Sequence, residues 1–256
     1  MLIAIDIGNS LIKLGFFVNR SLHVQEIASH PLLASRRYAA LIRDFMREKN
    51  IDKMPKGIIL SSVVKSRSEA LTRALKGLFL VEPLIVDHTK KTGIRLDIPK
   101  PEELGTDRLA NIVAAHALYK CPVAVIDFGT ATTISIAGNA ANFMGGSILP
   151  GLRLMNKALA KGTSRLSEVT LSATAPALGI DTASGIRSGL LIGTAGAVER
   201  IISRIEAETG LTLKTVLTGG YGGIVSRYMK RRHRLIPYLT LQGLRIMYAR
   251  GARCMN

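Results

Sequence analysis

The stretch MLIAIDIGNSLIKLGFFVN, residues 1–19, opens the chain and decides its fold. An apolar run ends at Asp6, a turn containing Gly8, Asn9 and Ser10 follows, and a second apolar run then begins. Gly and Asn tolerate the positive φ angles that tight hairpin turns require. The stretch therefore predicts a β-hairpin that has a carboxylate near the end of its first strand.

The stretch PVAVIDFGTATTISI, residues 122–136, repeats this plan. It has an apolar strand, an Asp-x-Gly turn, a small polar residue and a second β-branched strand. A shift of 121 residues aligns Asp6 with Asp127 and Gly8 with Gly129. Two such hairpins, each near the start of a half of similar size, indicate an internal repeat.

Helical patterns and short apolar segments alternate after the first hairpin. The expected helices span 34–49, 67–79 and 109–119, and the expected buried strands span 57–60 and 83–86. This alternation is typical of the α/β class. A polar, proline-rich stretch precedes the third helix, so we expect one half over residues 1–112 and the other over residues 113–256.

Composition excludes several classes of protein. A hydrophobic fraction of 47% excludes an intrinsically disordered chain. No apolar run reaches the roughly 18 residues that cross a bilayer, and Asp6 interrupts the apolar N-terminus before a signal peptide could form. A cytoplasmic protein without a membrane partner is therefore expected. The 2 cysteines exclude a disulfide framework and a four-cysteine zinc site, and the 5 histidines lack metal-ligand spacing.

The charge of the chain is strongly basic and uneven. There are 35 Lys and Arg residues against 18 Asp and Glu, a net charge of +17, and no acidic residue follows Glu208. This excess is consistent with a polyanionic partner or with a genome that favours basic residues. The densest cluster, Arg227 to Arg234, is either a solvated helix end or a nucleic-acid site. Because no base-reading module is recognisable, we expect at most weak binding that ignores sequence.

The first hairpin turn carries a possible phosphate-binding motif. Asp6 would hold Mg²⁺ through water, Asn9 and Ser10 would contact phosphate, and Lys13 would add positive charge on the return strand. Glycine in the turn lets phosphate approach the backbone closely. The alternative is an ordinary turn whose Asp accepts backbone hydrogen bonds.

Gly105-Thr106-Asp107-Arg108 lies at the expected start of the third helix. The helix dipole attracts anions there, Arg108 is able to clamp a carboxylate or phosphate, and Asp107 is able to accept a proton from a substrate hydroxyl. The alternative is a Thr or Asp N-cap beside a solvated arginine. In the same way, Gly145 to Gly151 is either a plain turn or a loop that admits a ligand.

Together these motifs closely resemble one family, the type III pantothenate kinases, in order and spacing over nearly the whole chain. The motifs are Asp-x-Gly-Asn-Ser at 6–10 with a following Lys13, Ser-Ser-Val-Val at 61–64, Gly-x-Asp-Arg at 105–108, Asp-x-Gly-Thr-Ala-Thr at 127–132, Gly-Gly-x-Ile-x-Pro-Gly at 145–151 and Thr-Gly-Gly at 218–220. The resemblance implies an α/β fold of the duplicated actin-like ATPase type, with ATP in the cleft between two similar halves. It also implies a homodimer and a required monovalent cation, potassium or ammonium.

The resemblance implies a role for each matching residue. The ATP phosphate loop comprises Asp6, Ile7, Gly8, Asn9, Ser10, Leu11, Ile12 and Lys13, and Thr130 is a further ATP contact. Asp107 is the proton acceptor, and the pantothenate site comprises Gly105, Thr106, Asp107, Arg108 and Thr182. Asp127 is the ligand of the monovalent cation. The implied reaction is ATP-dependent phosphorylation of pantothenate to 4′-phosphopantothenate, the first step of coenzyme A biosynthesis.

Several positions depart from the family pattern, among them Lys100, which stands where an asparagine is common. Ile98 stands where a tyrosine that contacts pantothenate is usual, and Tyr221 stands where an aspartate usually follows Thr-Gly-Gly. Because of Ile98, a kinase of the same fold that acts on another small molecule is an alternative hypothesis. The basic C-terminal segment leaves a further alternative from another class, a kinase-derived nucleic-acid-binding or regulatory protein.

Overall fold

A computed structural model describes the chain except residues 63–64, 89–91, 121, 172–173 and 253–256. The chain forms two compact units, each with its own sheet. The first unit comprises Met1–Gly93, Lys100–Ala114 and Thr240–Asn256, and the second comprises Ile94–Pro99 and Ala115–Leu239.

The first unit is built on a five-stranded sheet. Its strands are β1 (Leu2–Ile7), β2 (Leu11–Val18), β3 (Ser21–Ala28), β4 (Gly57–Ser62) and β5 (Leu84–Ile85), in the order β3-β2-β1-β4-β5. The β1–β2 and β2–β3 pairs are antiparallel, whereas β4 runs parallel to both β1 and β5. The predicted opening hairpin and the predicted buried strand at 57–60 are therefore confirmed. The strand predicted at 83–86 has only two residues, and Ile85 is 53% exposed, so it is an edge strand and not a buried one.

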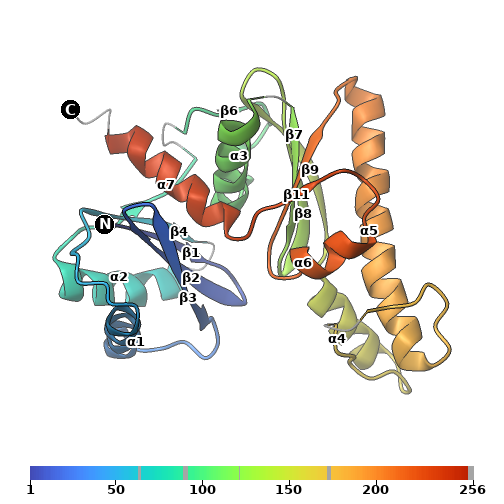
Figure 1. Cartoon of the computed structure of the whole chain (residues 1–256), viewed down its shortest axis with the longest axis horizontal. Helices are drawn as coiled ribbons and strands as arrows, with labels where there is room; N and C mark the ends of the chain where they lie inside the picture. Colours follow the sequence, from blue (N-terminus) through green and yellow to red (C-terminus); the bar gives the residue numbers. More distant parts are fainter. Residues whose placement is uncertain (63–64, 89–91, 121, 172–173, 253–256) are drawn as a thin grey trace. The chain divides into compact units, whose positions relative to one another are not determined.

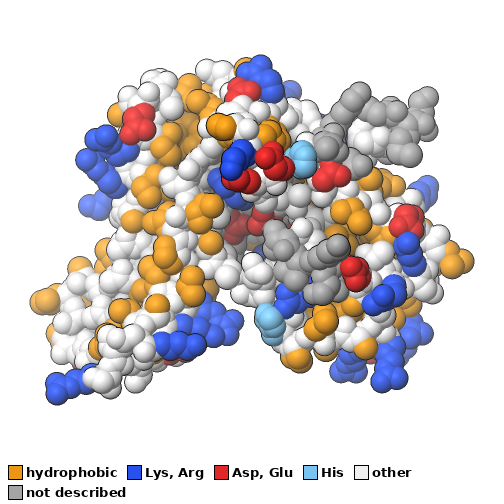
Figure 2. Space-filling view, turned by 180° about the vertical axis from the view of Figure 1, so that it is seen from behind, with side chains coloured by type: hydrophobic (Ala, Val, Ile, Leu, Met, Phe, Trp, Pro, Cys, Tyr) orange, Lys and Arg blue, Asp and Glu red, His pale blue; other side chains and the backbone are white. Residues whose placement is uncertain are grey.

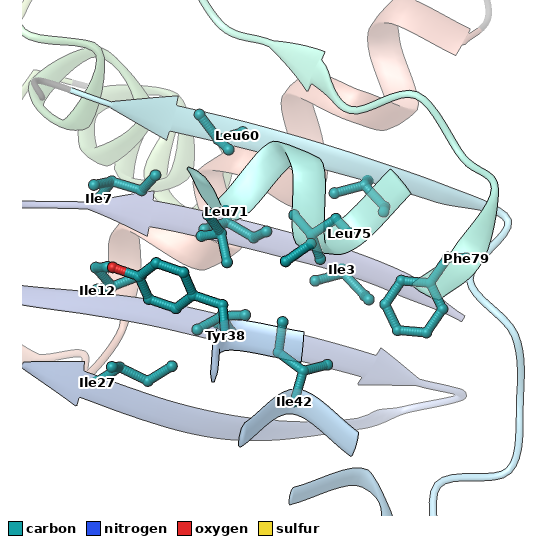
Figure 3. Close-up of a cluster of buried hydrophobic side chains, with 14 of the residues drawn as sticks. Ile3, Ile7, Ile12, Ile27, Tyr38, Ile42, Leu60, Leu71, Leu75 and Phe79 are labelled. Carbon is teal, nitrogen blue, oxygen red and sulfur yellow. The ribbon is translucent and has the colours of Figure 1, made fainter. Parts of the chain in front are cut away.

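Helices α1 (Ser35–Glu48) and α2 (Lys65–Phe79) cover one face of this sheet, as Figure 1 shows. The core lies between the helices and the sheet. Figure 3 shows side chains of both helices against those of the strands, among them Tyr38, Ile42, Leu71, Leu75, Ile3 and Ile12. Ile3, Ile5 and Ile7 of β1 all contribute to this core, because alternate side chains of a strand point to the same face of a sheet.

Helices α3 (Thr106–Tyr119) and α7 (Leu239–Ala252) contribute to the first unit beyond this core, together with the short helix η1 (Pro101–Glu103). Thr240 donates a 2.9 Å hydrogen bond to Asn111 on α3. A Cβ built at Gly15 of β2 would lie 2.9 Å from Leu241 of α7. The C-terminal helix thus belongs with the N-terminal sheet, which differs from the predicted division into 1–112 and 113–256.

The second unit is built on a six-stranded sheet. Its strands are β6 (Arg95–Leu96), β7 (Val123–Phe128), β8 (Ala131–Ala137), β9 (Asn142–Pro150), β10 (Lys214–Thr218) and β11 (Arg234–Leu235). Its helices are α4 (Leu152–Gly162), α5 (Thr182–Thr209), α6 (Gly222–Val225) and η2 (Ser226–Tyr228). Apolar side chains of α4, α5 and α6 form the core with those of β7, β8 and β10. Among the described residues, no helix is long and apolar enough to span a membrane.

The two sheets have the same plan. The order β9-β8-β7-β10-β11 in the second unit corresponds to β3-β2-β1-β4-β5 in the first, and β6 is added beside β9. The strand directions also correspond, because β7–β8 and β8–β9 are antiparallel while β7–β10 and β10–β11 are parallel. The internal repeat predicted from Asp6 and Asp127 is therefore confirmed.

Candidate functional site

Asp6 lies near the end of β1 in the first unit and is half-buried. In the sheet register it is level with Lys13 of β2 on one side and with Ser61 of β4 on the other. Directly opposite residues of neighbouring strands share a face and lie close together. The carboxylate is therefore flanked by a cationic and a hydroxyl side chain, a suitable setting for Mg²⁺ and phosphate.

The turn after Asp6 is held by hydrogen bonds to its backbone. The Gly8 N–H donates to the Leu11 carbonyl at 3.0 Å. Ser29, which follows β3, donates its hydroxyl to the Gly8 carbonyl at 2.7 Å and its N–H to the Ser10 carbonyl at 3.0 Å. Asn9 is left exposed at the tip. Ser29 was not among the residues expected from sequence, and only its equivalence to Gly151, after the third strand of the repeat, could have indicated it.

The predicted phosphate loop contains two kinds of residue. Ile7 and Ile12 are fully buried in the core of the first unit, so only their backbone could meet a ligand. Leu11 is 38% exposed and Asn9 is exposed, while Lys13 is half-buried. The side chains able to reach phosphate are therefore the polar ones, and the isoleucines anchor the turn.

The start of α3 is tied to the same edge of the first sheet. The Ser61 hydroxyl at the end of β4 lies 2.8 Å from the Thr106 hydroxyl at the start of α3. Because β1 and β4 are parallel, their carboxyl ends meet at one edge, and Asp6 is level with Ser61. Within the first unit, the structure thus brings the Asp6 turn together with the Gly105–Arg108 segment. Val63 and Val64 of the neighbouring motif lie outside the described residues.

Asp107 lies in the first turn of α3, because the helix begins at Thr106 and not at residue 109 as expected. Thr106 and Asp107 are therefore helical residues and not the expected N-caps. The Asp107 carboxylate accepts a 2.8 Å hydrogen bond from the backbone N–H of Arg108. A Cβ at Gly105 would meet this carboxylate, so any side chain there would displace Asp107 from its present position.

Arg108 is half-buried beside Asp107. Burial lowers the pKa of Arg108 below its ordinary value, and the neighbouring Asp107 acts in the opposite direction. The guanidinium stays charged at neutral pH because its ordinary pKa is very high. A cation and a carboxylate at a helix N-terminus form a setting able to bind an anionic group and accept a proton.

The second hairpin turn places Asp127 near the end of β7, level with Thr133 of β8 and Thr218 of β10. Gly219 follows β10 with a φ of +89°, a backbone conformation that favours glycine. A Cβ at Gly219 would collide with the Asp127 carboxylate. The missing side chain leaves room beside a carboxylate, and carboxylate and carbonyl oxygens suit a hard cation. The described residues contain no cluster of three or more His, Cys, Asp or Glu able to hold a metal ion.

Thr130 and Thr182 both belong to the second unit. Thr130 is exposed in the turn after Asp127, and its carbonyl accepts a 3.2 Å hydrogen bond from the Gly151 N–H. Thr182 is the exposed first residue of α5, which Asp181 caps. Hydrogen bonds from Ser184, first from its backbone N–H, lower the pKa of Asp181. The structure thus places Thr182 in a different unit from Gly105–Arg108.

A cavity of about 580 Å³ lies wholly within the second unit, a volume typical of small-molecule sites. Tyr221, Arg153 and Arg227 line it, beside Gly220. Asn156 fixes part of the wall by donating to the Val169 carbonyl at 2.8 Å and accepting from the Val169 N–H at 3.1 Å. Sequence reasoning missed this cavity, although the Thr-Gly-Gly motif stands at its edge.

Comparison with known proteins identifies the family. The model for type III pantothenate kinase matches residues 2–204. A type III pantothenate kinase of Moorella thermoacetica is 35% identical over 253 residues, which cover 98% of this chain and 100% of the relative. This chain belongs to the type III pantothenate kinase family. A second relative, from Myxococcus xanthus, is 34% identical over 253 residues and covers 98% of this chain and 99% of its own length.

Solved structures confirm the fold. The activator of the 2-hydroxyisocaproyl-CoA dehydratase from Clostridium difficile, solved with bound ADPNP, has a TM-score of 0.58 at 12% identity and covers 99% of this chain and 96% of its own. A polyphosphate/ATP-glucomannokinase from Arthrobacter has a TM-score of 0.51 at 14% identity and covers 97% and 98%. The duplicated actin-like ATPase fold predicted from the sequence is therefore confirmed.

One residue of the basic cluster Arg227–Arg234, Arg231, makes hydrogen bonds within the second unit. The Arg231 guanidinium donates to both Glu206 oxygens, at 2.8 and 2.5 Å, to the Thr215 hydroxyl at 2.7 Å and to the Leu213 carbonyl at 2.9 Å. This contact lowers the pKa of Glu206. Figure 2 shows Lys and Arg side chains in several groups on the face in view. Neither these contacts of the described residues nor the comparisons favour the nucleic-acid-binding alternative.

Proposed function

We propose that this protein transfers the γ-phosphoryl group of ATP to the 4′ hydroxyl of pantothenate, the first step of coenzyme A biosynthesis. The observation that carries the proposal is the 2.8 Å contact between Ser61 and Thr106. It ties Asp107 and Arg108 to the edge of the sheet that bears Asp6 and its turn. Membership of the type III pantothenate kinase family supports the substrate.

In the first unit, the turn binds and orients the triphosphate. Asn9 and Ser10 present polar groups at the turn, and Lys13 adds positive charge beside Asp6. Asp6 would hold Mg²⁺ through water, and the ion would neutralise charge that develops on the phosphoryl oxygens. The Gly8 turn exposes backbone that phosphate is able to approach closely.

The Gly105–Arg108 segment binds and activates pantothenate. Thr106 and Arg108 contact the substrate, with the Arg108 guanidinium facing its carboxylate. Asp107 accepts the proton of the attacking hydroxyl, the one proton transfer that this reaction requires. Phosphoryl transfer depends mainly on positioning and charge neutralisation, so a single positioned carboxylate is sufficient.

The second unit contributes the remaining contacts. Asp127, with the space left by Gly219, supports a site for potassium or ammonium, and Thr130 contacts ATP. Thr182 contacts pantothenate. The cavity beside Tyr221 is large enough for a nucleoside, and an aromatic side chain in its wall offers a stacking surface for a base. Tyr221 would thereby replace the polar contact of the usual aspartate.

We also propose that the enzyme is a cytoplasmic homodimer. Four large apolar side chains of the second unit are strongly exposed: Ile148 at 66%, Leu154 at 52%, Leu178 at 80% and Ile180 at 90%. Apolar surface of this kind is common where a partner covers it. Light scattering after gel filtration should give twice the monomer mass, and a purely monomeric protein would contradict this part of the proposal.

The substrate is tested by identifying the product. Purified protein with ATP, Mg²⁺ and potassium should release ADP only when pantothenate is added, and phosphorus NMR should show a new ester on the primary hydroxyl. Absence of pantothenate-dependent turnover at any tested concentration would contradict the proposal. A panel of other small alcohols, tested in parallel, shows whether Ile98 accompanies a change of substrate.

A further inference from the structure

We infer that Ser29 and Arg67 are positioning residues for the first turn, and the inference rests on the proposed function of that turn as the phosphate site. Ser29 is fully buried, so it does not touch a ligand itself. Its hydroxyl and N–H are both bound to turn carbonyls, those of Gly8 and Ser10, at 2.7 and 3.0 Å. These two contacts flank Asn9, the exposed tip of the turn.

The contact with Gly8 fixes the direction of a backbone donor. The carbonyl of Gly8 and the N–H of Asn9 belong to one planar trans peptide, in which they point in opposite directions. Because the carbonyl points to the buried Ser29, the Asn9 N–H points away from it. A donor that is already oriented costs less ordering entropy when phosphate binds, which strengthens binding.

Arg67 of α2 holds Ser29 in turn. Its Nε donates to the Ser29 carbonyl at 2.7 Å, and its Nη2 lies 2.9 Å from Nε2 of His30. The Arg67 side chain is only 8% exposed, so it does not reach the phosphates. It therefore acts through Ser29, and the chain of contacts runs from α2 through the end of β3 to the turn.

The test compares Ser29→Ala with a matched control, Ser68→Ala. Ser68 lies on α2, as Arg67 does, and donates a 2.6 Å hydrogen bond to Ser62 at the end of β4. Ser29→Ala should raise the KM for ATP and the Kd for a non-hydrolysable ATP analogue about three- to tenfold, the range for one lost neutral hydrogen bond. The KM for pantothenate should stay unchanged. Ser68→Ala should leave all three values unchanged.

A double-mutant cycle then tests the order of action. Arg67→Ala should weaken nucleotide binding in the same direction, and Ser29→Ala/Arg67→Ala should be about as weak as the weaker single variant. Melting temperatures show which variants are folded. Unchanged nucleotide affinity in folded Ser29→Ala, or an equal loss in Ser68→Ala, would overturn the inference. Failure of the proposed function would instead appear as a wild-type protein without pantothenate-dependent turnover.

Discussion

The hairpin turns of the two units follow one plan but differ in length. In the first unit Ile7 pairs with Ile12, which leaves the four residues 8–11 in the turn. In the second unit Phe128 pairs with Thr132, which leaves only the three residues 129–131. Each turn begins with a glycine whose N–H donates back across the turn, at 3.0 Å in the first and 3.1 Å in the second. The longer turn presents more backbone, and Lys13 follows it on β2, two features that suit the first turn to phosphate.

The residue that supports each turn also differs. Ser29 and Gly151 both follow the third strand of their unit, and each donates its N–H to a turn carbonyl, at 3.0 and 3.2 Å. Ser29 adds its hydroxyl, whereas a Cβ at Gly151 would collide with the carbonyls of Gly129 and Thr130. The backbone contact is thus shared by both halves, while the first turn is held by a side chain and the second by close packing.

The largest expected effect is on turnover, and it comes from replacing Asp107, the proposed proton acceptor in the first unit. Asp107→Asn should lower turnover by about 10² to 10⁴, the usual range for a lost general base, because the amide does not accept the proton. The fold should persist, since Asn is isosteric and still accepts from the Arg108 N–H. Steady-state assays measure the loss, with Glu103→Gln, an exposed carboxylate paired with Lys100, as control. Unchanged turnover in Asp107→Asn would reassign the base.

The second prediction concerns the free energy of unfolding of the second unit. Arg231→Ala should destabilise the second unit by about 2–3 kcal/mol, because it leaves the half-buried Glu206 carboxylate without its cation. Arg232→Ala, an exposed neighbour, should change stability by less than about 0.5 kcal/mol. Urea denaturation measures both. Equal losses of stability in the two variants would show that the contacts of the Arg231 guanidinium do not stabilise the second unit.

A smaller loss of unfolding free energy is expected from disturbing the close packing of the second turn at Gly151. Gly151→Ala should cost about 1–3 kcal/mol of unfolding free energy, because the added Cβ forces the turn carbonyls to shift. Gly162→Ala, where an added Cβ meets open space at the end of α4, serves as control and should be neutral or slightly stabilising. Thermal melting compares them. A tolerated Gly151→Ala would show that the two turns do not differ in how they are held.

Acid should loosen the second unit, the smallest of these effects. Contacts lower the pKa of three of its carboxyl groups: Asp97 through Arg95, Asp181 through Ser184 and Glu206 through Arg231. A folded pKa below the unfolded value means that stability is present above the unfolded pKa and is lost as pH falls through the folded one.

The measurement is amide hydrogen exchange, corrected for intrinsic rates. Below about pH 4, near the ordinary carboxyl pKa, protection in the second unit should fall, and Arg231→Ala should remove the part due to Glu206. Constant protection of the second unit down to pH 2, or earlier loss in the first unit, would contradict the expectation.

Local sequence patterns were sufficient for the repeated core. The hairpins at Asp6 and Asp127 were predictable because strand periodicity, glycine and turn residues are properties of adjacent positions. The placement of α7 was not, because the bond between Thr240 and Asn111 joins residues 129 positions apart. Likewise β6 has only two residues and is specified by its partner β9.

The candidate site likewise contains residues that sequence patterns indicated and residues that they did not. Gly105–Arg108 was predictable from residue types that together carry a carboxylate and a guanidinium. Arg231 looked like part of a solvated cluster, because its partner Glu206 lies 25 positions away on α5. Ser29 carried no local signal, since its importance comes from contacts that only the folded β3 brings to the turn.

We propose that the first turn binds phosphate and the second binds the monovalent cation. Comparing turnover in potassium with turnover in sodium tests this claim most directly. Asp127 is proposed to hold the monovalent cation, so wild-type turnover should fall when sodium replaces potassium. Asp127→Ala should be slow in both salts, while Ser68→Ala should respond as the wild type does. Equal wild-type rates in the two salts, or a surviving potassium dependence in Asp127→Ala, would contradict the assignment of the cation to the second turn.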